Sequence, residues 1–154
     1  MDRMIFANLP VSDLQKATDF YLGLGFTLNP DFSSDEGSCI VISDTIFVML
    51  LKQDFFAGFL AEGSTPHLGS SAKEVLNCLT ASSTEEVDDL VTKAQASGGS
   101  VYLPAKESMP GMYGASIADP DGHGEREHRG GPGAVMLCGE LRLAGLFQIG
   151  IHRT

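Results

Sequence analysis

One order of local signals occurs twice in the chain, roughly 75 residues apart, and this repeat limits the fold more than any other feature. In the first copy, an apolar and β-rich run from Met4 to Val11 precedes a helix signal, because Ser12 and Gln15 have the spacing of a capping box. Three short apolar runs separated by turn residues follow, at 26–32, 39–43 and 45–51. The first copy therefore predicts a strand, a helix and three further strands.

The second copy repeats these signals in the same order. A β-like run from Val75 to Ala81 precedes a second capping box at Ser83 and Glu86, and apolar residues then recur at helical spacing. Segment 99–104 also matches segment 25–30 in its pattern. We therefore predict an α+β fold within a single domain 1–154, with βαβββ modules at 4–51 and 74–123 joined by a linker at 52–73 that contains a short helix.

The charge and the apolar content of the chain indicate which kinds of binding partner to expect. The net charge is −10, so the phosphate backbone of a nucleic acid or an anionic membrane surface would be repelled. No apolar run approaches the roughly 18 residues that span a bilayer, and the N-terminus lacks the pattern of a secretion signal. Three widely spaced cysteines fit reduced thiols better than disulfides. We expect a cytoplasmic protein that binds neither nucleic acid nor membrane.

Three motifs give the chain a family resemblance. They are Asn8-Leu9-Pro10-Val11-Ser12-Asp13-Leu14, Phe20-Tyr21-Leu22-Gly23-Leu24-Gly25-Phe26 and Asp119-Pro120-Asp121-Gly122-His123. Together they resemble the vicinal-oxygen-chelate superfamily of glyoxalases and bleomycin-resistance proteins, most closely its predicted lactoylglutathione-lyase-like branch. The resemblance implies that the two βαβββ modules form a cup-shaped mixed sheet around a small ligand, commonly in a homodimer. In metal-dependent members, His, Gln or Glu side chains on four strands hold a divalent cation in this cup.

The four metal-ligand positions that the resemblance implies carry no usual ligand in this chain. The first corresponds to Phe6, the second to Met49, the third to Leu79 or Thr80, and the fourth to Arg126. Phenyl and aliphatic groups cannot coordinate a cation, and a thioether is a poor ligand for hard ions. We therefore expect an apolar cup without a metal cofactor. The residues expected to line it are Phe6, Asn8, Met49, Leu79 and Tyr113.

Three classes of function remain open. The first is a glyoxalase/bleomycin-resistance-like protein that binds a small molecule in the metal-free cup. The alternative is a glyoxalase-type lyase or isomerase that holds Zn, Ni, Mn or Fe through a non-standard set, in which Glu125 or Glu127 supplies a carboxylate beside the fourth position. His123 lies in a Pro- and Gly-containing turn, which favours a structural role for its imidazole. A purely structural protein is the third class, because a fold alone does not fix function.

Residues 124–154 form a Gly- and Arg-rich tail that the resemblance does not cover. Family members typically continue from the Asp-Pro-Asp-Gly-His motif directly into the last strand. Two hypotheses account for the difference. Either that strand was replaced, for example through a reading-frame change, or the tail is an extension in which Ala134–Cys138 and Leu141–Ile151 add strands or a helix. An exposed sheet edge would follow from the first hypothesis.

Overall fold

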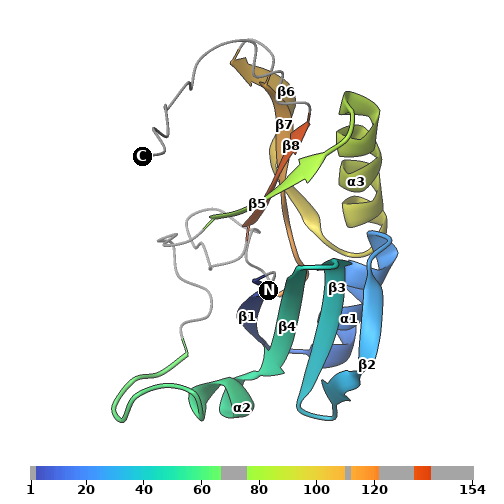
Figure 1. Ribbon diagram of the computed structural model, residues 1–154. Coiled ribbons are helices and arrows are strands. Elements are labelled where there is room, and N and C mark those ends of the chain that lie inside the picture. Colours follow the sequence, from blue (N-terminus) through green and yellow to red (C-terminus); the bar gives the residue numbers. More distant parts are fainter. Residues whose placement is uncertain (1–2, 67–75, 110–111, 122–133, 140–154) are drawn as a thin grey trace, which may run out of the picture.

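The computed structural model describes residues 3–66, 76–109, 112–121 and 134–139, which form two βαβββ modules (Figure 1). The first module contains β1 (Ile5–Val11), α1 (Leu14–Gly23), β2 (Thr27–Ser34), β3 (Gly37–Ser43) and β4 (Ile46–Lys52), and is followed by the short helix α2 (Gln53–Ala57). The second module contains β5 (Leu76–Ala81), α3 (Thr84–Ala96), β6 (Ser100–Met109), β7 (Met112–Ala118) and β8 (Ala134–Gly139). No helix in the described ranges is long and apolar enough to cross a membrane.

Each module has the same sheet topology. The first sheet has the strand order β1-β4-β3-β2 and the second has the order β5-β8-β7-β6. In each sheet the first and last strands of the module pair in parallel, whereas the other neighbours are antiparallel. One helix packs on one face of each sheet, α1 on the first and α3 on the second (Figure 1). The predicted α+β fold with mixed sheets is therefore confirmed.

The two helices begin differently. Helix α1 is capped by Asp13, whose carboxylate accepts a hydrogen bond from Lys16 N at 3.0 Å. The predicted capping box of Ser12 and Gln15 is wrong, because Gln15 donates along the helix to Asp19 instead. Helix α3 begins as predicted.

At the start of α3, the Ser83 hydroxyl accepts a hydrogen bond from Glu86 N at 3.2 Å. The Glu86 carboxylate in turn accepts from Ser82 N at 2.6 Å and from the Ser82 hydroxyl. The bond to the Ser83 hydroxyl satisfies a backbone N–H group that the first helical turn leaves unpaired, and the bonds from Ser82, which precedes the N-cap, fix the direction of the Glu86 side chain.

The modules meet through α1. Phe20 and Tyr21 are 1% and 2% exposed, and their rings make an edge-to-face contact at 5.3 Å. Gly99, which lies between α3 and β6 in the second module, is so close to Phe20 that a Cβ there would sit 2.3 Å from Phe20 Cε2. Burial, reinforced by the carboxylates of Asp119 and Asp121, raises the pKa of the Tyr21 hydroxyl far above its ordinary value. These aromatic rings therefore form the core that joins the modules.

A hydrogen-bonded turn adds a second link between the modules. Asp121 accepts hydrogen bonds through Oδ1 from both the backbone N–H and the hydroxyl of Ser12, which precedes α1. The Asp121 N–H donates to Asp119 Oδ1 at 3.2 Å. The Asp-Pro-Asp part of the third sequence motif thus ties the end of β7 to the start of the first helix.

Strand β8 lies within the segment that the sequence set apart as a tail. It occupies the position between β5 and β7, which corresponds to the position of β4 between β1 and β3. Its register pairs Leu79 with Leu137 and Ala115 with Leu137. The extension hypothesis allowed a further strand or a helix at Ala134–Cys138; the structure has a strand there, and it occupies the last-strand position of the second module instead of adding to it. The expected second element, Leu141–Ile151, lies outside the described residues.

Candidate functional site

The face of the first sheet that points away from α1, called the open face here, carries three of the residues expected to line the cup. Ile40, Leu50 and Val48 belong to the core under α1, so the alternate residues of β3 and β4 lie on the opposite face. The register places Phe6 beside Phe47 and Asn8 beside Met49. Phe6, Asn8 and Met49 therefore come together on the open face of two neighbouring strands.

Two aromatic rings stack on this face. Phe6 and Phe47 stack with their ring centroids 4.7 Å apart and their planes inclined by 11°. Among the described strands, β1 lies at the edge of the sheet with β4 as its one neighbour, and Phe6 is 44% exposed. Exposed aromatic surface of this kind is suited to contact with a flat apolar ligand.

Beside the aromatic pair runs a row of smaller groups. Met49 pairs with Asn8 on β1 and with Cys39 on β3. The Asn8 amide donates to Phe6 O at 3.2 Å along its own strand, so this polar group is oriented by the backbone. Cys39 is fully buried, and burial raises the pKa of its thiol, which keeps the sulfur neutral and poorly nucleophilic. The row continues through Cys39 to Asn29 on β2, so among the described residues it carries two amides and no charged side chain.

The structure places the other two expected lining residues, Leu79 and Tyr113, apart from the open face. Leu79 and Tyr113 lie on the face of the second sheet that packs against α3, in the same layer as Ala115 and Ile117. The Tyr113 hydroxyl donates to Asp88 Oδ1 at 2.8 Å, and this bond raises the pKa of the tyrosine. The alternation of strands β5 and β7 relative to their core, which the sequence did not reveal, is the reason for the difference.

The described side chains near the family ligand positions do not fit a divalent cation. On β1, β4 and β5 the open-face positions nearest the family ligand positions hold Phe6, Met49 and Thr80, which offer a ring, a thioether and a hydroxyl. Among the described residues, no three His, Cys, Asp or Glu side chains gather where they could hold a metal ion. The residues proposed as alternative donors, Glu125 and Glu127, lie outside the described ranges, as do His123 and Arg126.

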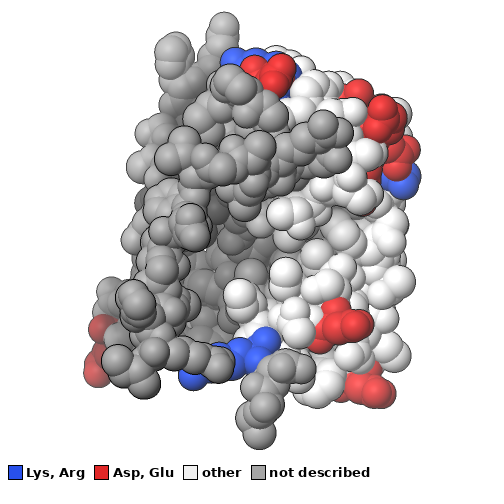
Figure 2. Space-filling view, turned by 45° about the horizontal axis from the view of Figure 1, so that its top comes forward, with Lys and Arg blue, Asp and Glu red and all other residues white. Residues whose placement is uncertain are grey.

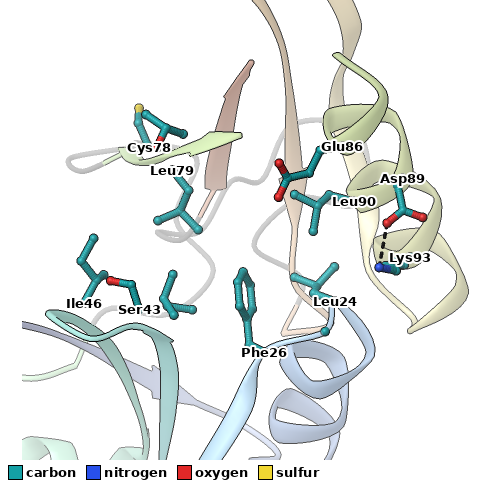
Figure 3. A pocket seen from close by; sticks show the side chains of 13 residues that line it. Leu24, Phe26, Ser43, Ile46, Cys78, Leu79, Glu86, Asp89, Leu90 and Lys93 are labelled. Atoms are coloured by element: carbon teal, nitrogen blue, oxygen red, sulfur yellow. Dashed lines mark ion pairs between the residues drawn. The ribbon is translucent and has the colours of Figure 1, made fainter. Parts of the chain in front are cut away.

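A pocket, which we call the inter-module pocket, lies between the two modules at the end of the first sheet (Figure 3). Its volume is about 570 Å³. Phe26 and Leu24 approach it from one side and Leu79 and Leu90 from the other, while Glu86, Asp89 and Lys93 reach it from α3 (Figure 3). The remaining lining residues are Gly25, Ile42, Ser43, Ile46, Cys78 and Thr80.

Sequence reasoning missed this pocket because its walls come from distant parts of the chain. Leu79 was predicted to line a cavity, and it does line this one, but on the helix side of its sheet. Gly25 adopts a φ of 101°, which turns the chain from α1 into β2 beside the pocket. The glycine at the end of the predicted helix was the only local signal, and it does not specify what the turn encloses.

Comparisons with known proteins agree with this architecture. A family model described as "Bleomycin resistance protein-like N-terminal" matches residues 3–43. The hypothetical protein SA1046 from S. aureus has 31% sequence identity and a TM-score of 0.66, and the match covers 90% of this chain and 94% of that one. A search of curated proteins finds no significant match.

Two further solved structures share the fold at lower identity. A glyoxalase/bleomycin resistance protein/dioxygenase family enzyme from Burkholderia phytofirmans PsJN has a TM-score of 0.70 at 18% identity, covering 91% of this chain and 100% of that one. TnmS3, an antibiotic-binding protein from Streptomyces sp. CB03234, has a TM-score of 0.55 at 21% identity, covering 91% and 97%. The repeated module, its strand order and these matches together show that the chain has the glyoxalase/bleomycin resistance fold and that its residues 3–43 match the bleomycin resistance protein-like N-terminal family.

Proposed function

We propose that the protein binds a small, largely apolar molecule on the open face of the first sheet, through contact with aromatic and aliphatic side chains and without metal chelation. The observation that supports this function most directly is the stacked pair of Phe6 and Phe47, partly exposed on a face whose family ligand positions hold no carboxylate or imidazole. When an aromatic ligand is buried against such a pair, apolar surface is removed from water and the rings stack. Both effects favour binding.

The uncharged character of this face favours a neutral ligand. Met49 adapts its shape to irregular ligands through its flexible thioether, and the Asn8 amide supplies a single polar contact that orients the ligand. An antibiotic-binding protein shares the fold, which supports binding rather than turnover as the use of this face. We further propose that the protein is cytoplasmic and forms a homodimer. Sedimentation equilibrium of the purified protein tests the homodimer.

The binding proposal is tested with N-phenyl-1-naphthylamine, a neutral aromatic fluorophore whose emission rises in apolar sites. Phe6→Ala removes half of the stacked pair, and we expect a loss of affinity of about tenfold, which corresponds to about 1.4 kcal/mol. Leu22→Ala is the matched control, because Leu22 is 39% exposed but lies on α1, on the other side of the sheet. Equal affinities of the two variants, or turnover of a hemithioacetal by the wild-type protein, would contradict the proposal.

A further inference from the structure

The inter-module pocket differs in chemistry from the open face. Leu24 and Phe26 form an apolar wall on one side, and Leu79 and Leu90 form one on the other (Figure 3). The ionisable carboxylate and ammonium groups of the lining are Glu86, Asp89 and Lys93, so two negative charges and one positive charge leave a net charge of −1. In the part of the chain that the structure describes, the two open-face rows that contain Phe6 and Asn8 carry no charged side chain.

These charges are held in place by the helix that carries them. Lys93 Nζ lies 2.7 Å from Asp89 Oδ2, one helical turn away, so these two charges largely compensate each other. The Glu86 carboxylate is oriented by the bonds from Ser82, and hydrogen bonds from the Ser82 side chain and backbone lower its pKa, so it is ionised at neutral pH. Glu86 is thus a fixed negative charge at the rim of an apolar pocket.

The surroundings reinforce the sign of this charge. Acidic side chains gather over α3, which carries Glu85, Glu86, Asp88 and Asp89 in its first half (Figure 2). With a net charge of −10, the whole chain attracts small cations and repels small anions. A ligand that reaches this pocket is therefore selected for positive charge, while its remaining atoms are selected for apolar contact.

We propose that the inter-module pocket is a second binding site, specific for an organic monocation that has an apolar body and one ammonium group. The volume of about 570 Å³ lies within the range of small-molecule sites. The apolar body packs between Phe26 and Leu90, and the ammonium group pairs with the Glu86 carboxylate. This site is separate from the open face, because Leu79 and Ile42 lie on the helix side of their sheets.

The test compares three probes that share an alkyl chain: n-octylammonium, n-octanol and n-octanoate, titrated into the full chain by isothermal calorimetry at pH 7. Octylammonium is expected to bind more tightly than the other two. Glu86→Gln retains an oxygen that accepts from Ser82 but loses the charge, and it should weaken octylammonium binding by about tenfold. Glu85→Gln is the matched control, because Glu85 lies in the same helical turn but does not line the pocket.

The position of the bound probe is checked with a fluorescent reporter. The chain contains no Trp, so Phe26→Trp places a single indole in the inter-module pocket and Phe6→Trp places one on the open face. Octylammonium should shift the emission of the Phe26→Trp protein and leave that of the Phe6→Trp protein unchanged. Octanoate binding as tightly as octylammonium, equal weakening by Glu86→Gln and Glu85→Gln, absence of octylammonium binding, or a response of the Phe6→Trp protein alone would each overturn the proposal.

Discussion

A single methyl group added at Gly99 should destabilise the contact that joins the modules. A Cβ at this position would lie 2.3 Å from Phe20 Cε2 and 2.5 Å from the Ala118 carbonyl oxygen. Ordinary carbon contacts are about 3.5–4.0 Å, so these groups would have to separate by more than about 1 Å. The Ala118 oxygen belongs to the backbone of β7, and Phe20 is buried in the core, so neither group can move without disturbing other contacts.

The size of the effect follows from two opposing terms. Overpacking of this kind costs about 1–3 kcal/mol. Replacing Gly by Ala also restricts the unfolded chain, which returns about 0.4–1 kcal/mol. We therefore expect Gly99→Ala to lower the free energy of unfolding by about 1–2 kcal/mol. Urea unfolding followed by far-UV circular dichroism measures this as a lower midpoint with an unchanged slope.

Two further variants make the test specific. Gly58→Ala is the control, because Gly58 has a φ of −64° and its nearest neighbour, the Phe55 carbonyl oxygen, would be 3.3 Å from the new Cβ. Phe20→Leu should cost less stability in the Gly99→Ala background than in the wild type, since the smaller side chain leaves room for the methyl group. A coupling energy of about 0.5–3 kcal/mol is expected. An unfolding free energy of Gly99→Ala equal to that of the wild type would refute the close packing of the modules.

Two other predictions concern titratable groups. Because the hydrogen bond to Asp88 raises the pKa of Tyr113, the neutral phenol is the form that the fold favours; its contribution is present below about pH 10 and is lost as the pH rises through the raised pKa. Wild-type stability should therefore fall above that pH more steeply than the stability of Tyr113→Phe, and parallel unfolding curves would contradict the assignment. Iodoacetamide should alkylate exposed Cys78 in the native protein but buried Cys39 only in denaturant, as peptide mass mapping would show; rapid native labelling of Cys39 would exclude its burial.

The repeated order of local signals was sufficient to predict the fold. Helix starts and strand runs are set by neighbouring residues, so the capping box at Ser83 and the strand containing Phe6 were accessible from the sequence. Asn8 and Phe6 share a face because strand side chains alternate with a period of two. Met49 could be placed beside them through the family resemblance, and the register of β1 and β4 agrees.

Features that depend on packing between distant parts of the chain could not be predicted from local sequence signals. The sequence did not show which face of the second sheet Leu79 and Tyr113 occupy, because the orientation of each strand relative to α3 is fixed by contacts across the sheet. The inter-module pocket is formed by segments as distant as Leu24 and Lys93, which no local pattern connects. Strand β8 begins at Ala134, beyond the point where the family motif leads directly into the last strand, so its place between β5 and β7 depends on pairing alone.

The central claim is that the open face around Phe6 and Met49 binds its ligand by apolar contact rather than through a metal ion. The most direct test measures the dissociation constant of N-phenyl-1-naphthylamine after treatment with EDTA, and again after addition of Zn²⁺, Ni²⁺, Mn²⁺ or Fe²⁺. We predict equal dissociation constants in all samples and a weaker constant in Phe6→Ala under each condition. Loss of binding after EDTA that is restored by one of these cations would contradict the claim.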